Sequence, residues 1–165
     1  MIILKDNPVG IDKEILKFQK YLEYRLSDWN LQIYGRSEII DKKLLIYYKK
    51  NDYIEALVLD SQFNGRVFFK DSSNSIIDTN KISTSIEIIF LLNIKNIMPD
   101  ISHRSDEEIR VELINLISKK VGGQIKVLKG QEVLDKYSTK LIDMQPYHFL
   151  SFSFDYSYSQ HNCFN

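Results

Sequence analysis

The sequence predicts a single α+β domain whose sheet is mostly antiparallel and carries two helices packed on one side. Three observations predict this fold class. Two long segments, 83–97 and 147–159, alternate apolar with polar residues in the period of two that a half-buried strand requires. Two others, 12–28 and 105–120, repeat apolar residues at the three- and four-residue steps of an amphipathic helix. No internal repeat or linker divides the 165 residues, a length that suits one domain.

The first helix follows a short lead-in over residues 1–10, which contains a brief strand at Ile2–Leu4. Asp12 is the expected N-cap, because its carboxylate can accept hydrogen bonds from the free amides of the first turn. The stripe that this helix would dock on the sheet consists of Ile11, Ile15, Phe18, Leu22, Leu26 and Trp29.

Short strands and turns occupy the next part of the chain. Strands are predicted at 31–34, 44–48, 53–59 and 67–70. The residues Gly35-Arg36-Ser37 would turn the first strand, and the polar residues 49–52 would join the second and third into a hairpin. Asn64-Gly65 is a strong turn signal before the fourth. Residues 71–82 then form a long polar loop, which is either mobile or makes an interaction.

The two long strands have different faces. In 83–97 one face is apolar throughout and the other only at its centre, so both faces are expected to be covered there, and Pro99 ends the strand. In 147–159 one face is apolar and aromatic, whereas the other is small and polar. We expect the two strands to be neighbours in one sheet and the last one to complete it.

The second helix has a clear start and end. Ser105 and Glu108 form a capping box, and acidic residues in the first turn suit the helix dipole. Gly122-Gly123 ends the helix. A strand is predicted at 125–128, followed by a mixed segment over 132–144 that contains one helical turn.

The composition bounds the function. The chain has 22 basic and 22 acidic residues, so it lacks the basic excess typical of nucleic-acid-binding proteins, and little long-range repulsion opposes self-association. A single cysteine, Cys163, excludes an internal disulfide and fits a reducing compartment. The N-terminus lacks a signal-peptide pattern, and no apolar run is long enough to predict a membrane span.

No cofactor, metal or catalytic residue is predicted. The histidines His103, His148 and His161 lie in separate segments without metal-ligand spacing. His161 and Cys163 have no third ligand nearby, and no glycine-rich phosphate loop follows a strand.

Two observations keep a nucleic-acid-acting protein as an alternative. Glu55, Asp60 and Lys70 suggest a small metal-dependent nuclease, although no acid stands two positions before the lysine. A basic and aromatic patch, typical of single-strand binders, consists of Lys42, Lys43, Tyr47, Tyr48, Lys49 and Lys50. Asp41, Asp52 and Glu55 interrupt this patch, which favours solvated strand ends. A host-side adaptor or immunity-type binding module is a third alternative.

The order of the elements and the end of the chain resemble one family. Residues 137–154, Tyr-Ser-Thr-Lys-Leu-Ile-Asp-Met-Gln-Pro-Tyr-His-Phe-Leu-Ser-Phe-Ser-Phe, look like the closing segment of the tail terminator, neck and tail-completion proteins of tailed bacteriophages. In both, a bend (here at Pro146) precedes a long alternating strand. These subunits run as a leading helix, a hairpin with a long loop, a long strand, a helix and closing strands, which this chain follows over most of its length.

The resemblance implies a non-enzymatic virion structural protein, a head–tail connector or tail terminator made in the host cytoplasm. Such subunits form rings, hexamers or dodecamers, whose neighbours are the portal or connector and the tail tube, with passive contact to DNA in a channel. The family has no catalytic residues to transfer and no membrane partner. The polar face of the last strand and the long loop are the candidate interfaces: Ser151, Ser153, Asp155, Ser157 and Ser159, with Asp71, Ser72, Ser73, Asn74 and Ser75.

Overall fold

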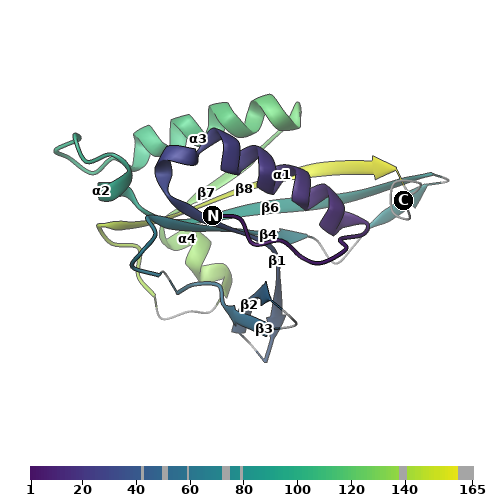
Figure 1. Ribbon diagram of the computed structural model, residues 1–165. Helices are drawn as coiled ribbons and strands as arrows, with labels where there is room; N and C mark the ends of the chain where they lie inside the picture. The colour runs from purple at the N-terminus through teal and green to yellow at the C-terminus, as the bar shows by residue number, and fades with distance from the viewer. Residues whose placement is uncertain are drawn as a thin grey trace.

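The computed structural model describes residues 1–41, 43–49, 52–58, 60–71, 75–78, 80–137 and 141–159. The strands are β1 (Leu31–Ile40), β2 (Lys43–Lys49), β3 (Asp52–Glu55), β4 (Gly65–Asp71), β5 (Ile76–Asp78), β6 (Lys81–Asn93), β7 (Lys126–Lys129) and β8 (Tyr147–Ser159). The helices are α1 (Ile11–Arg25), α2 (Ile94–Ile97), α3 (Asp106–Val121) and α4 (Gln131–Leu134), with short 3-10 turns at Ser27–Trp29 and Asp135–Tyr137. The two long helices, α1 and α3, cover one face of a long twisted sheet (Figure 1).

The sheet has the order β3-β2-β1-β4-β6-β8-β7, with β5 pairing beside β6. Only β1 and β4 pair in parallel among the described strands, so the predicted mostly antiparallel α+β fold is confirmed. The two long strands are neighbours, as predicted. Their register runs from Lys81 opposite Ser159 to Asn93 opposite Tyr147, and it gives the sheet its long axis.

The larger core lies between the sheet and the helices α1 and α3. Ile15, Phe18 and Leu22 of α1 are buried here, as are Ile109 and Leu113 of α3. Burying such a side chain contributes about 1.5–3 kcal/mol, so this stripe accounts for the docking of the amphipathic segments. Two helices therefore pack on one side of the sheet, as the sequence predicts.

A second core covers the opposite face. Tyr34, Phe68 and Phe149 of the sheet pack with Val133 and Leu134 of α4, and the hairpin of β2 and β3 contributes further apolar side chains. The predicted covering of both faces of the long central strand is thus confirmed. The helical turn expected within 132–144 is α4.

The start of α1 differs from the prediction. The N-cap position is Gly10, whose φ of 56° suits a residue without a side chain, and no side chain caps the helix. Asp12 lies two residues after the cap, inside the first turn, and its carboxylate pairs with Lys5 and with Arg36, at 3.0 Å from the Arg36 Nε. Through these two ion pairs the carboxylate links the lead-in to β1.

Three strand boundaries also differ. Gly35-Arg36-Ser37 does not turn the chain: it lies inside β1, where the pairing with β4 shifts register. The third strand ends at Glu55 instead of residue 59. The long strand ends at Asn93, because the Asn93 side chain accepts from the Asn96 amide at 3.2 Å and caps α2.

The capping box at α3 is not formed. Ser105 is the N-cap residue, but it is buried, and its hydroxyl donates to the Ile94 carbonyl at 3.3 Å. Glu108 faces the His103 ring at 2.8 Å instead of reaching back to Ser105. The buried carbonyl at the start of α2 captures the hydroxyl, an interaction that no local pattern reveals.

Candidate protein–protein interface

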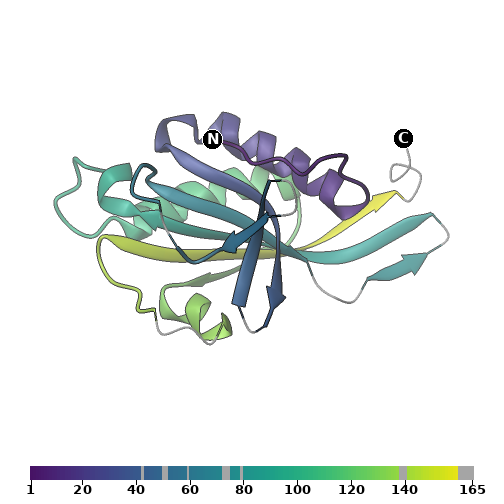
Figure 2. The same ribbon diagram turned by 60° about the horizontal axis from the view of Figure 1, so that its bottom comes forward.

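A three-stranded finger projects beyond the helices at one end of the sheet. It consists of β5, the Lys81–Ile86 part of β6 and the Phe154–Ser159 part of β8. Both ribbon views place it past the end of α1 (Figure 1 and Figure 2). The predicted loop 71–82 is therefore partly a strand: β5 pairs with β6 from Ile76 opposite Ser83 to Asp78 opposite Lys81.

One face of the finger carries small polar residues from neighbouring strands. Ser83 pairs with Ser157, whose hydroxyls lie 2.8 Å apart, and Ser85 pairs with Asp155. Ile76 stands opposite Ser83 on the other side of β6. Asp71, the first residue of the predicted loop set, stands opposite Ile86 on this same side of β6, whereas the predicted residues of β8 lie on the other side.

The predicted interface residues differ in their exposure and surroundings. Asp155, Ser157 and Ser75 are exposed, and Ser153 and Ser159 are half-buried. Asp71 ends β4 and pairs with Arg36 at 3.5 Å. Ser72, Ser73 and Asn74 lie outside the described residues. Ser151 is 0% exposed on the face of the second core, so its inclusion is wrong: β7 and α4 cover the strand there, and the alternation alone does not show which stretch a neighbour covers.

The finger exposes apolar side chains that the sequence analysis did not single out. Ile76 is 74% exposed and Ile77 is 68% exposed. Consecutive residues of a strand point to opposite faces, so one isoleucine lies on the polar face and the other beside Ile82 on the reverse. In the sequence, the signal for this exposed apolar surface is the pair of isoleucines within the otherwise polar segment 71–82.

The base of the finger is attached to α1. Phe18 contacts Phe154 and Tyr156, with ring centroids 5.5 and 5.4 Å apart. The Tyr156 hydroxyl donates to the buried Glu14 carboxylate at 2.8 Å, and Lys17 donates to the same carboxylate. Burial, followed by this hydrogen bond and the negative charge of Glu14, raises the pKa of Tyr156 to about 12. The finger is therefore anchored by packing and by a neutral phenol.

An apolar hollow lies on the second-core face, at the other end of β8. Its volume is about 350 Å³. It is lined by Leu57, Val58, Leu91, Leu141, Ile142, Tyr147 and Phe149. Ile142 is 69% exposed and Val58 is 54% exposed, so the rim is apolar as well. Its walls come from three distant segments, which explains why no sequence pattern predicts it.

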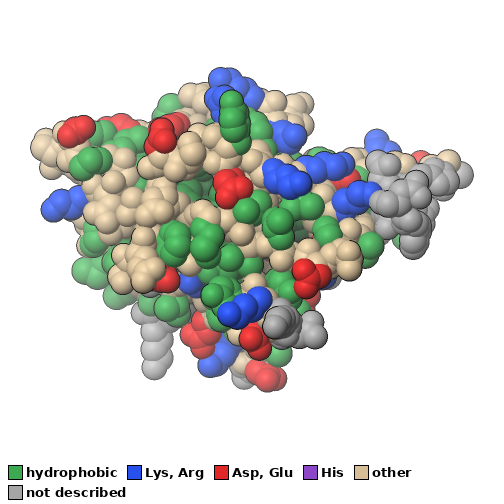
Figure 3. All heavy atoms as spheres, viewed as in Figure 1, with side chains coloured by type: hydrophobic (Ala, Val, Ile, Leu, Met, Phe, Trp, Pro, Cys, Tyr) green, Lys and Arg blue, Asp and Glu red, His purple; other side chains and the backbone are tan. Residues whose placement is uncertain are grey.

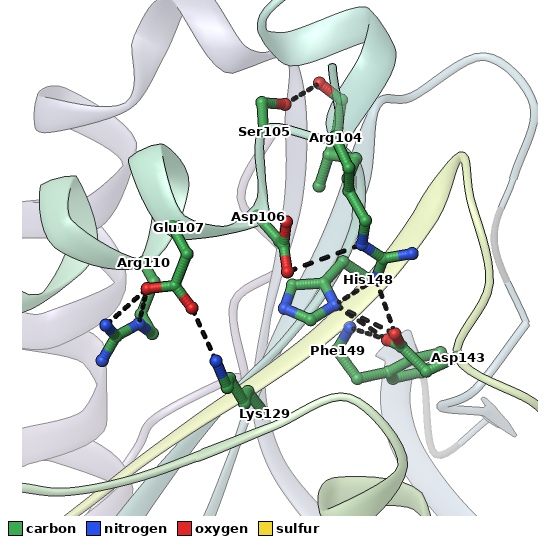
Figure 4. Close-up of polar contacts among 10 residues, drawn as sticks. Arg104, Ser105, Asp106, Glu107, Arg110, Lys129, Asp143, His148 and Phe149 are labelled. Atoms are coloured by element: carbon green, nitrogen blue, oxygen red, sulfur yellow. Dashed lines mark hydrogen bonds and ion pairs between the residues drawn. The ribbon is translucent and has the colours of Figure 1, made fainter.

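A buried polar cluster holds one wall of this hollow in place (Figure 4). The Asp143 carboxylate accepts from Arg104 Nη2 at 2.6 Å and from the Phe149 amide at 2.9 Å, and it lies 2.9 Å from His148 Nδ1. The Gly130 amide donates to the Phe149 carbonyl at 2.8 Å. The Asp143 side chain and Gly130 thus bind the Phe149 backbone as a neighbouring strand would. Arg104 also pairs with Asp106 at 3.5 Å.

Gln131 of α4 fixes the same wall from the other side. Its side-chain oxygen accepts from the Asp143 amide at 3.3 Å, and its nitrogen donates to the Leu141 carbonyl at 3.4 Å. Ile142 lies between these two anchors. The segment that lines the hollow is therefore positioned by hydrogen bonds on both flanks.

The His148–Asp143 pair resembles the base and orienting acid of a hydrolase, but it does not form an accessible site. His148 is 2% exposed, and its free nitrogen, Nε2, is buried without a hydrogen-bond partner. A general base must reach its proton within hydrogen-bond distance, and no substrate can approach this atom. The cluster therefore has a structural role in this conformation.

The residues of the nucleic-acid alternative have other partners. Lys43 forms an ion pair with Glu55 at 2.8 Å, and Lys49 lies over the Tyr48 ring. Lys70 lies over the Tyr137 ring. Lys42 and Lys50 lie outside the described residues. On the face seen in Figure 3, basic and acidic side chains are interspersed.

Within the described ranges, no group of three or more His, Cys, Asp or Glu residues is arranged to hold a metal ion. His161 and Cys163 fall outside those ranges. No described helix is both long and apolar enough to cross a membrane. Comparisons with protein-family models, curated proteins and solved structures returned no match.

Proposed function

We propose that the protein is a non-enzymatic assembly subunit that acts by contact with copies of itself and with neighbouring proteins. Its place is a ring at the head–tail junction of a tailed bacteriophage, as a tail terminator or neck subunit. The resemblance of its element order and closing segment to those proteins motivates the specific role. The finger is the observation that supports an assembly role.

The finger has the properties of a contact element. Large exposed apolar side chains at its tip cost free energy in water that a partner surface would recover. One of its edges is also open: β7 pairs with β8 only from Leu150 to Ser153, and no described strand pairs with that side of Phe154 to Ser157. Unpaired strand edges are templates for pairing with another chain.

The proposal predicts a discrete oligomer. Native mass spectrometry and sedimentation velocity, over a range of concentrations and with the adjacent tail proteins added, should give a closed species such as a hexamer or dodecamer. Virions purified from the source phage should contain the chain. A protein that stays monomeric alone and with those neighbours, and that is missing from virions, would contradict the proposal.

Substitution on the polar face provides a variant test. Ser157→Trp should abolish the oligomer while leaving the circular dichroism spectrum native, because Ser157 is exposed and lies on the open part of β8. Val111→Trp, at an exposed position on α3, is the matched control and should assemble normally. Loss of native structure in Ser157→Trp would assign this face to the core.

The nucleic-acid alternative has a separate test. Binding of a labelled oligonucleotide that weakens with salt, and that is lost in Tyr47→Ala, would favour it. The neutral net charge and the Lys43–Glu55 ion pair support the assembly role instead.

A further inference from the structure

We infer that the apolar hollow receives the finger tip of a second copy of this chain. This inference rests on the proposed assembly function and names its contact: β5 of one copy, with Ile76 and Ile77 on its two faces, against Val58 and Ile142 of the next.

The two surfaces match in chemistry. The tip presents two isoleucines that are 74% and 68% exposed, and all seven residues that line the hollow are apolar or aromatic. A hollow of about 350 Å³ is in the size range of ligand pockets, so it can receive side chains of a partner. Docking would remove both surfaces from water, and a central apolar contact of this kind is where interfaces concentrate their free energy.

The two surfaces cannot meet within one copy. The finger contains the Lys81 end of β6, whereas the hollow adjoins the opposite end, where Asn93 pairs with Tyr147. At roughly 3.3 Å per residue, the two ends of this ribbon are about 40 Å apart. Figure 1 and Figure 2 both show the finger and the segment entering β8 at opposite ends of the molecule.

With the finger tip at one end of the chain and the apolar hollow at the other, docking of one copy on the next is a head-to-tail contact. Such heterologous contacts between identical subunits close into a ring when the rotation permits. Electrostatics do not oppose it: the chain has no net charge, and the tip carries one charge of each sign, at Asp78 and at Lys81, which stand opposite each other in the strand register. A second copy is therefore the expected occupant of the hollow, because the chain itself carries a matching apolar surface at its other end.

Two single-surface variants test the contact. The finger variant is Ile76→Asp with Ile77→Asp, and the hollow variant is Ile142→Asp; all three positions are exposed, so both proteins should fold. Each variant should weaken self-association more than tenfold in sedimentation velocity, because an aspartate would have to be desolvated in the apolar contact. Tyr24→Asp, at a position 78% exposed on α1, is the control and should assemble as the parent does.

Mixing the two variants gives the decisive result. The finger variant retains an intact hollow, and the hollow variant retains an intact finger. Their mixture should therefore form a one-to-one heterodimer that cannot grow, whereas each variant alone stays monomeric. Native mass spectrometry distinguishes the dimer expected in the mixture from the monomers expected of each variant alone.

A cysteine pair locates the contact independently. In a Cys163→Ser background, Ile77→Cys with Ile142→Cys should give a ladder of disulfide-linked oligomers on oxidation, and either cysteine alone should give at most a dimer. Assembly by the parent chain with an intact oligomer in Ile142→Asp would overturn the inference while leaving the proposed function standing. A parent chain that never assembles would overturn both.

Discussion

The carboxylate of Asp143 illustrates how one residue organises a surface. It accepts hydrogen bonds from Arg104 and from the edge amide of Phe149, and it lies 2.9 Å from His148 Nδ1. It belongs to the segment that lines the apolar hollow. Hydrogen bonds to a charged group are stronger than those between neutral groups, so this single side chain fixes the wall more firmly than the loop backbone would.

Asp143→Ala should therefore lower the free energy of unfolding by about 2–3 kcal/mol, because it leaves buried donors without an acceptor. It should also weaken self-association, since the wall of the hollow loses its anchor. Urea denaturation measures the first effect. Asp100→Ala, at an exposed loop position, should change stability by less than about 0.5 kcal/mol. Equal midpoints for the two variants would show that the cluster does not hold the wall.

Tyr156 gives the fold a defined response to alkaline pH. Its pKa is raised to about 12 in the folded chain, against about 10 when unfolded. Between these values the unfolded state loses the proton that the folded state keeps, so the unfolded state binds fewer protons and stability falls as pH rises. Below pH 10 the contribution of neutral Tyr156 to the free energy of unfolding is fully present.

Tyr156→Phe should remove this pH dependence. The variant should be less stable than the parent at pH 7 by about 1 kcal/mol, because buried Glu14 loses a donor. Its stability should then fall less steeply between pH 10 and 12. Denaturation midpoints at several pH values measure the difference, and the other tyrosines are common to both proteins. Denaturation midpoints that fall equally with pH in the two proteins would show that Tyr156 does not cause the alkaline loss of stability.

Among the elements, β4 depends on a close approach that only glycine permits. Gly65 lies between β1 and β6, and a Cβ atom there would come within 2.7 Å of Leu31 Cδ2 and 2.8 Å of the Leu91 carbonyl oxygen. The second contact involves the backbone of a paired strand, which cannot rotate away.

Gly65→Ala should accordingly destabilise the protein by about 1–3 kcal/mol, the range for overpacking a filled core. Gly35→Ala is the matched control in the same sheet: nothing lies within 4 Å of its added Cβ, and its stability should be unchanged or slightly higher. Thermal denaturation of the two variants compares them directly. A stable Gly65→Ala variant would mean that β1 and β6 can separate at this point.

At the scale of the whole molecule, the antiparallel pair of β6 and β8 sets the geometry. Its register extends through the helix-covered core and continues into the finger, so one rigid ribbon connects the finger to the end that bears the hollow. The proposed ring would use both ends of this ribbon. Shifting the register of β8 by one residue would move its apolar face to solvent and disturb both contacts together.

The sequence by itself determined the α+β class, the two amphipathic helices and the two long strands, because periodicity depends only on which face of an element is buried. Its errors fall where a distant partner overrides a local preference. Asp12 lies inside the helix and pairs with Arg36 and Lys5, the Ile94 carbonyl accepts from the Ser105 hydroxyl, and Ser151 is buried where α4 and β7 adjoin β8. Only the tertiary structure decided the finger and the apolar hollow, because each combines segments far apart in the chain, and the exposure of a side chain depends on where the packed helices end.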